Sequence, residues 1–211
     1  MKRFLSILII IIAKIYDKYI KGPILKGGLG SCGKHVVFRW NEWHQPWQNV
    51  HLADYTQLID ATIISHGGKL IMKKGSGAAD GLLVITNNHR RVVGKWIRDV
   101  FDSEEQDYEK DIVIEEDCWV GSNVTLLNGC TIGRGSHIGT GSVIRNDIPP
   151  YAIVTGNPAK IIGFSLNPDE IIEHEKALYP EEERLPLQLL EKNYEKYFLK
   201  RLKEIKEFSK I

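Results

Sequence analysis

Cysteine is scarce in this sequence, which has three in 211 residues, and no two of them form a Cys-x-x-Cys pair. Cys32, Cys118 and Cys130 are also an odd number, so the spacing does not indicate a framework of disulfides. Small buried thiols in a reducing compartment fit this usage better. We therefore expect a cytoplasmic protein.

An excess of one charge is missing as well. The 28 Lys and Arg residues nearly balance 27 Asp and Glu residues, which leaves a formal net charge of +1. This balance does not favour a polyanionic partner, so we do not expect the protein to bind nucleic acid. The length suits one domain with appendages.

No apolar run is long enough to span a bilayer, since the run FLSILIIIIA near the start has only ten residues. The residues after it place Ile12, Ile15 and Tyr19 on one helical face, which predicts an amphipathic helix over 1–22 that Gly22-Pro23 breaks. Three roles stay open for this helix. It packs on its own chain or a neighbouring subunit, it contacts a membrane surface through residues 1–21, or it is a cleaved signal without an evident cleavage site.

A six-residue period dominates the middle of the chain. Branched aliphatic residues recur at every sixth position, at Ile114, Val120, Leu126, Ile132, Ile138 and Ile144. An α-helix has no such period. A chain that turns a corner every six residues does, because one aliphatic side chain per short strand then points toward a shared axis. Three strands close a triangular coil of about eighteen residues.

Residues eighteen apart should then stack, for example Ile114 under Ile132. Because each coil buries its aliphatic residues only against its neighbours, repetition itself creates the core. We therefore predict a mainly β domain over residues 23–163, a three-sided parallel β-helix. Leu52, Leu58, Ile64 and Leu70 extend the period backwards, although the register fails at Ser76.

Two segments interrupt the repeat. Residues 90–111 form a charged excursion that contains Trp96, and excursions from a solenoid often carry function. Earlier, the segment RWNEWHQPW gathers three tryptophans beside His44, and it is either a sugar-stacking platform or a packed loop. The tryptophans are Trp40, Trp43 and Trp47.

After Gly163 the period becomes helical, which predicts a helical extension over residues 164–211. Asn167-Pro168-Asp169-Glu170 has the pattern of a capping box. A second helix carries an apolar stripe that begins at Leu187, and we expect this stripe to cap the last coil or to contact another subunit.

At this point the sequence resembles the hexapeptide-repeat O-acetyltransferases, among them galactoside, maltose and capsule-sugar acetyltransferases. The motifs that carry the resemblance are Asp117–Ser122, Ile138–Ile144, Asp147–Pro150 and Gly156–Lys160. The resemblance implies a left-handed parallel β-helix, acetyl-CoA as cosubstrate, a sugar or saccharide acceptor, and a homotrimer with active sites between subunits.

The resemblance also assigns residues. His89, in Thr86-Asn87-Asn88-His89, occupies the place of the catalytic histidine, although Arg90 stands where proline is common. The resemblance does not assign the contacts to the acceptor, for which we expect Asn87, Asn88 and Trp96. Contacts to the cofactor would come from Ser122, Gly139, Thr140, Gly141, Arg145, Asn146 and Lys160.

The chemistry supports this assignment independently. An alcohol is almost wholly protonated at neutral pH, so a positioned base must remove its proton as the oxygen attacks a thioester, and histidine suits this role. A backbone N–H at a coil corner would stabilise the oxyanion. His66 is either a structural corner residue or part of the same active-site cleft as His89.

Three alternatives were weighed against O-acetyl transfer. An N-acyltransferase acting on an amino sugar would use the same base, so the sequence does not separate amine from hydroxyl acceptors. A non-catalytic trimeric scaffold would not need His89 or the excursion. A γ-type carbonic anhydrase requires zinc-binding histidines five residues apart. Gly94 stands five after His89, so no metal is expected.

Overall fold

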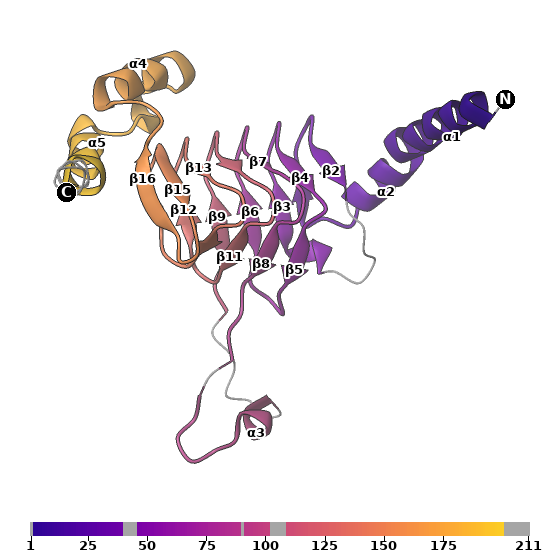
Figure 1. Cartoon of the computed structure of the whole chain (residues 1–211), viewed down its shortest axis with the longest axis horizontal. Coiled ribbons are helices and arrows are strands. Elements are labelled where there is room, and N and C mark those ends of the chain that lie inside the picture. The colour runs from indigo at the N-terminus through magenta and orange to yellow at the C-terminus, as the bar shows by residue number, and fades with distance from the viewer. Residues whose placement is uncertain (1, 40–45, 90, 102–108, 201–211) are drawn as a thin grey trace, which may run out of the picture.

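The computed structural model describes residues 2–39, 46–89, 91–101 and 109–200, and it is a stack of parallel coils with helices at its two ends (Figure 1). Three sheets form the sides of the stack. Sheet A contains β1 (Ser31–Cys32), β3 (Val50–Leu52), β6 (Leu70–Met72), β9 (Ile112–Ile114) and β12 (Thr131–Ile132). Sheet B contains β2 (Val37–Arg39), β4 (Gln57–Ile59), β7 (Gly77–Ala78), β10 (Trp119–Val120), β13 (His137–Ile138), β15 (Ala152–Thr155) and β16 (Lys160–Phe164). Sheet C contains β5 (Thr62–Ile64), β8 (Leu83–Ile85), β11 (Thr125–Leu127) and β14 (Val143–Ile144).

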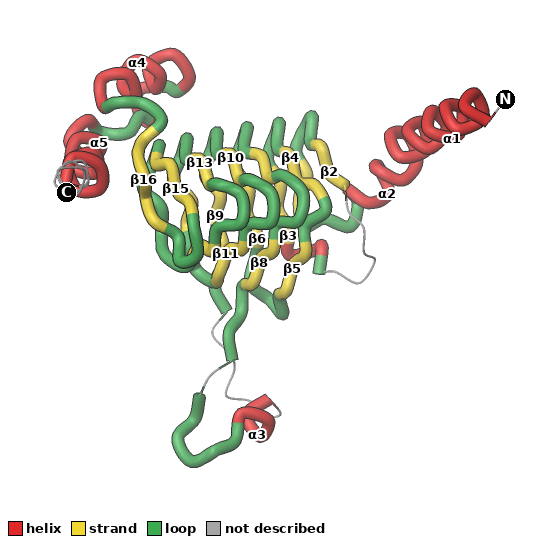
Figure 2. Tube along the Cα trace, in the orientation of Figure 1, coloured by secondary structure: helices red, strands yellow, loops and turns green. Residues whose placement is uncertain are grey.

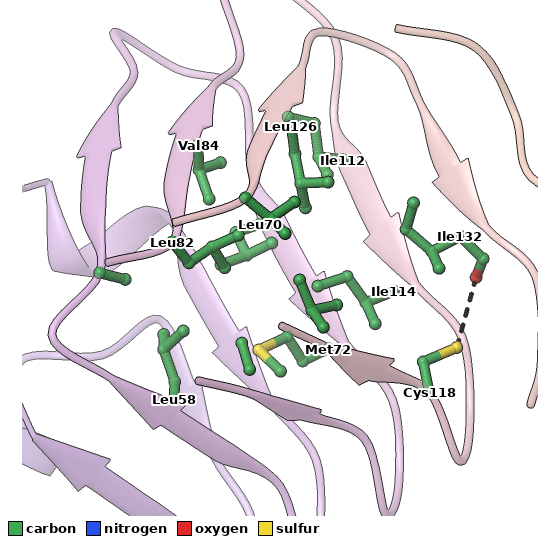
Figure 3. Packing of buried hydrophobic residues seen from close by; sticks show 14 of the residues in the cluster. Leu58, Leu70, Met72, Leu82, Val84, Ile112, Ile114, Cys118, Leu126 and Ile132 are labelled. Carbon is green, nitrogen blue, oxygen red and sulfur yellow. Dashed lines mark hydrogen bonds between the residues drawn. The ribbon is translucent and has the colours of Figure 1, made fainter. Parts of the chain in front are cut away.

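The predicted stacking of residues eighteen apart is confirmed. Ile114 pairs with Ile132 across β9 and β12. Two further pairs eighteen residues apart form in the same way, Val120 with Ile138 and Leu126 with Ile144. All six aliphatic residues of the period are at most 2% exposed. The core is therefore a column of branched side chains, which Figure 3 shows from close by. The predicted mainly β, three-sided parallel β-helix is confirmed.

The period extended backwards from this region was wrong in detail. In β5 the inward residue is Ile63, which is 4% exposed, whereas Ile64 is 45% exposed and faces outward. Leu70 is buried but pairs with Val50, and Leu52 stacks on Met72 instead. The reason is coil length, because Leu52 and Met72 are twenty residues apart rather than eighteen.

The number of residues between the inward-facing side chains of successive strands differs among the three edges of the stack. From sheet A to sheet B the inward residues are always six apart, as in Leu52 to Leu58 and Met72 to Ala78. From sheet C to sheet A the step varies. It is nine residues from Ile63 to Met72, thirty from Val84 to Ile114, six from Leu126 to Ile132, and four from Ile144 to Ile148. Among the described coils with a strand in all three sheets, extra residues thus leave the stack at this edge, which carries the excursion with α3 (Ile97–Phe101) (Figure 1).

The N-terminal helix continues past Gly22-Pro23, so the predicted break is wrong. α1 (Lys2–Tyr16) leads through a π-helical turn, η1 (Asp17–Lys21), into α2 (Gly22–Lys26). Pro23 lies in the first turn of α2, where a missing N–H is tolerated. Leu25 and Leu29 then join the core of the first coils.

The tryptophan segment is only partly visible, since Trp40, Trp43 and His44 lie outside the described residues. Trp47 begins a 3-10 turn, η2 (Trp47–Asn49), and is 4% exposed. Its ring packs edge to face on Phe38 with 5.1 Å between centroids. Trp47 is therefore a core residue in this structure.

The C-terminal helices cover the last coil. α4 (Pro168–Leu178) begins with the predicted capping box between Asn167 and Glu170. It is followed by η3 (Glu181–Glu183), α5 (Leu187–Tyr194) and the π-helical η4 (Glu195–Leu199). Ile171 of α4 and Leu190 of α5 form a small core with Tyr151 of the last coil. α1 and α5 thus lie at opposite ends of the stack (Figure 2).

Candidate functional site

The residues assigned by sequence lie on two different edges of the stack. The excursion edge comprises the turns from sheet C to sheet A, which are residues 65–69, 86–111, 128–130 and 145–147. The glycine edge comprises the turns from sheet B to sheet C, chiefly residues 121–124 and 139–142. Sheet C lies between these two edges.

The base of the excursion is closed by backbone hydrogen bonds. The Lys110 N–H donates to the Thr86 carbonyl over 3.0 Å, and the Thr86 N–H donates to the Ile64 carbonyl over 3.0 Å. Gly68 packs tightly beneath this closure, because a Cβ at Gly68 would lie 2.7 Å from Cβ of Thr86. Thr86 is fully buried. The two ends of the excursion, at Thr86 and Lys110, are therefore bonded to each other, and Thr86 is also bonded to the preceding coil.

His89 follows this closure by three residues. Asn87 is 8% exposed, whereas Asn88 and His89 are exposed to solvent. His66 lies on the same edge one coil earlier, and its backbone N–H donates to Glu109 Oε1 over 2.8 Å. The structure thus presents an imidazole at the rim of a rigid edge, next to a long excursion.

Trp96 lies farther out on the excursion, just before α3, and is 78% exposed. Val93 near it is also fully exposed. In the described part of a single chain, the excursion therefore exposes one aromatic and one aliphatic side chain to solvent. Neither residue approaches the core of the stack.

The glycine edge groups most of the residues assigned to the cofactor. The N–H groups of Gly139 and Gly141 are used between coils, since they donate to Val154 and Ser122 carbonyls over 2.7 and 2.9 Å. The intervening Thr140 N–H donates to no described residue, and the same holds for the Ser122 N–H eighteen residues earlier. Two backbone donors at stacked corners are therefore available to a ligand.

Gly141 has a clear structural reason. Its φ of +73° lies in the left-handed region, and open space surrounds the position where a Cβ would stand. The requirement is thus on backbone conformation rather than on packing.

The remaining assigned residues divide between the edges. Lys160 begins β16 and pairs with Thr155, whose side chain lies against Gly139, so Lys160 belongs with the glycine edge. Arg145 and Asn146 follow β14 and are exposed on the excursion edge, in the same column of turns as His89.

One chain alone does not bring the two groups together. Sheet C separates them, and its strands of two or three residues, at roughly 3.3 Å per residue, keep them on the order of 10 Å apart. The excursion edge of one copy and the glycine edge of another could meet. This geometry is compatible with a site shared between subunits.

Sequence reasoning missed a buried ionic cluster at the third edge, between sheets A and B. Glu175 of α4 is fully buried and accepts hydrogen bonds from Arg134 Nη1 at 3.0 Å, Tyr151 Oη at 2.7 Å and the Leu185 N–H at 2.9 Å. Arg134 also contacts Glu116 over 3.3 Å. A lone glutamate in a charged helix gives no sequence signal of this role.

The cluster raises the pKa values of Arg134 and Tyr151. Burial opposes the charge of Arg134, but Glu175 and Glu116 outweigh it and raise the pKa of its guanidinium. Burial and the hydrogen bond to Glu175 raise the pKa of Tyr151, which stays a protonated donor. Nothing here resembles a reactive centre, and the cluster anchors the C-terminal helices.

A metal centre is not evident in the described part of the chain. Among residues 2–39, 46–89, 91–101 and 109–200, no group of three or more His, Cys, Asp or Glu side chains is arranged to hold an ion.

Comparisons with known proteins agree with this architecture. Residues 111–146 match the family model described as bacterial transferase hexapeptide (six repeats). A Saccharomyces cerevisiae protein named as an acetyltransferase is 25% identical over 146 residues, which are 69% of this chain and 71% of that protein. A Lysinibacillus sphaericus protein named as a macrolide acetyltransferase is 34% identical over 117 residues, which are 50% of this chain and 65% of that protein.

Solved structures are similar over most of the chain. A maltose O-acetyltransferase from Clostridium difficile 630 is 26% identical with a TM-score of 0.59, covering 70% of this chain and 76% of that one. A hexapeptide-repeat acetyltransferase from Vibrio cholerae O1 biovar eltor, solved with acetyl-CoA, has the same fold at 23% identity and a TM-score of 0.56, covering 67% and 74%. Residues 111–146 thus carry a hexapeptide repeat, and the relatives and solved structures that share the stacked coils are acetyltransferases, which supports an acyltransferase.

Proposed function

We propose that this protein transfers the acetyl group of acetyl-CoA to a hydroxyl group of a sugar or saccharide precursor, with His89 as the general base. The observation that carries the proposal is the placement of His89. It is exposed on the excursion edge, three residues beyond a buried Thr86 that is hydrogen-bonded to both neighbouring segments. A base exposed at this edge can reach a substrate that binds there.

The reaction requires one proton transfer and one exchange of bonds. His89 removes the proton of the acceptor hydroxyl as the oxygen attacks the thioester carbonyl carbon. The new C–O bond forms, the tetrahedral intermediate collapses, and the C–S bond breaks. The CoA sulfur leaves as a thiolate and takes up the proton from the imidazolium, so the base is regenerated without any other reactant.

The glycine edge supports the acyl donor in this proposal. The unpaired Ser122 and Thr140 N–H groups are suited to donate hydrogen bonds to carbonyl oxygens of an extended pantetheine arm. Lys160 on the same edge is exposed and suits a phosphate through a charge-assisted contact. Arg145 and Asn146 lie on the excursion edge and would act from the other subunit.

A homotrimer would complete the site. Because the donor-binding residues and His89 lie at opposite edges of sheet C, we propose that a neighbouring copy supplies one of the two edges. We infer three equivalent sites, each between the excursion edge of one subunit and the glycine edge of the next. Light scattering should give a mass of three chains, and a stable monomer would contradict a shared site.

A hydroxyl acceptor is favoured by the similarity to the maltose O-acetyltransferase, the solved structure with the higher identity of the two compared. The exposed Asn88 next to His89 and the exposed Trp96 farther out on the excursion suit a saccharide, since an amide can bind hydroxyl groups and a flat ring can stack on a pyranose.

The test is a coupled assay that follows CoA release from acetyl-CoA with sugars, nucleotide-sugars, amino-sugars and a macrolide as acceptors. We expect release with a hydroxyl acceptor and a fall of about 10²–10⁴-fold for His89→Ala. His66→Ala, on the same edge, is the matched control and should retain activity. Full turnover by His89→Ala would remove this residue from the mechanism, and acetylation only at amines would replace the hydroxyl acceptor by an amine.

A further inference from the structure

We propose that α1 is a membrane-surface anchor, which lies along the headgroup region of a bilayer rich in anionic lipid. The inference concerns residues 4–26 and is independent of the acyl transfer proposed above.

The first observation is that α1 has no cover. It extends away from the first coil instead of folding back on a sheet, as Figures 1 and 2 show. Its large apolar side chains are about half exposed or more, from 73% for Phe4 to 42% for Leu8. A contiguous apolar surface of this kind marks an interaction site in a soluble protein.

The second observation is the width of the apolar face. At about 100° per residue, one uninterrupted sector of roughly 160° contains only apolar side chains. The opposite side is mixed, with Ile10 beside Ser6, Ala13 and Lys14, and Ile7 lies next to the border of the sector. The residues of this sector within α1 are Phe4, Leu5, Leu8, Ile9, Ile11, Ile12, Ile15 and Tyr16.

The third observation is charge. The segment from Met1 to Lys26 contains six Lys or Arg residues and one Asp, a net charge of +5, so the other 185 residues together carry −4. The basic residues lie at both ends of the apolar run, at positions 2–3 and from 14 onwards. An anionic surface would attract this segment while the middle of the helix enters the apolar boundary.

These observations favour a lipid surface over a second copy of the chain. Two or three parallel copies of this segment would place like charges side by side, whereas anionic headgroups neutralise them. A helix partner also covers a seam narrower than 160° and would leave part of the apolar face in water. The length fits lying on a membrane rather than crossing it, because no helix among the described residues is long and apolar enough to span one.

Aromatic residues support the same orientation. Tyr16 and Tyr19 follow the apolar run and are 52% and 65% exposed. Tyrosine favours the boundary between hydrocarbon and water, since its ring is apolar and its hydroxyl is polar. Together with Lys14 and Lys21, they would mark the level at which the helix leaves the lipid.

The test is flotation of the full-length protein with vesicles of phosphatidylcholine alone or mixed with phosphatidylserine. We expect flotation with the mixed vesicles, weaker flotation with the neutral ones, and loss at high salt. Ile12→Glu should reduce binding at least ten-fold. Ser6→Glu adds the same negative charge on the opposite face of the helix and should retain most of the binding. Lys14→Gln should weaken binding to the mixed vesicles by roughly five-fold.

Each other outcome overturns the proposal. Failure of the unmodified protein to float, or equal losses for Ile12→Glu and Ser6→Glu, would exclude an apolar face in lipid. A lower mass of Ile12→Glu in lipid-free solution would assign the face to a second copy. Hydrogen exchange of residues 4–16 in the unmodified protein, with and without vesicles, gives the same decision without a variant. CoA release with a soluble acceptor should be equal in all these proteins, so failure of the anchor does not bear on the catalytic proposal.

Discussion

Removing the carboxylate of Glu175 should release the C-terminal helices from the stack. In Glu175→Ala, the guanidinium of Arg134, whose side chain is 13% exposed, keeps only Glu116 as an acidic partner. Tyr151 Oη and the Leu185 N–H lose their acceptor as well. Breaking a buried ion pair by removing one partner costs about 3–5 kcal/mol.

This cost should appear as local opening, because Glu175 lies on α4 and its partners Arg134 and Tyr151 belong to the coils. A cost of about 3–5 kcal/mol increases the population of the opened helix by about 10²–10³·⁶-fold. Hydrogen exchange of α4 amides, followed by mass spectrometry, measures this change directly. Residues 112–144 should keep their protection, since the aliphatic column is unaltered.

Glu173→Ala is the matched control, since this exposed residue of the same helix should change the opening free energy by less than about 0.5 kcal/mol. Unchanged exchange of α4 in Glu175→Ala, or an equal effect of Glu173→Ala, would refute the anchoring role. The pH dependence adds a second check. Because folding raises the pKa of Tyr151, its contribution is complete at neutral pH and is lost as the pH rises above the ordinary tyrosine value of about 10.

Two further predictions test the core. Ile63→Ala should lower the unfolding free energy by about 2–4 kcal/mol and Ile64→Ala by less than about 1 kcal/mol, measured by denaturant titration, because only Ile63 faces inward; equal losses would contradict the register of β5. Burial raises the pKa of Cys118 and Cys130 to about 12, so a thiol reagent at pH 8 should label Cys32 in the folded protein and all three only after unfolding. Rapid native labelling of Cys118 would contradict the packing of the column.

The sequence predicted the regular half of the fold because one physical rule operates there without exception. From Ile114 to Ile144 every corner takes six residues, so counting alone locates each buried side chain. Ile64 was assigned inward by the same count. It faces outward because the corner before β5 is one residue shorter than the regular one, and the corner after β5 is longer. No residue type in this segment indicates either change.

The candidate site was predictable to a different extent. The position of His89 before the excursion followed from a resemblance to known motifs, and the structure adds the hydrogen bonds that close the excursion at Thr86 and Lys110. Part of the division between two edges follows from spacing, because counting in sixes places Ser122 and Thr140 at stacked corners and Arg145 at the next corner. The edge of His89 could not be counted, because the thirty-residue step from Val84 to Ile114 departs from the regular coil. The buried role of Glu175 could not be predicted either, because its partners Tyr151 and Arg134 are 24 and 41 residues away in the chain.

The unequal steps between sheets have a consequence for how such a protein can diversify. Where sheet A turns into sheet B, each inward pair is separated by six residues, so one additional residue there would rotate the following side chains out of the column. Where sheet C turns into sheet A, steps from four to thirty residues coexist with an unbroken column. New loops can therefore be grafted beside His89 while the hydrophobic axis keeps its order, and acceptor preference can change without the stack being rebuilt.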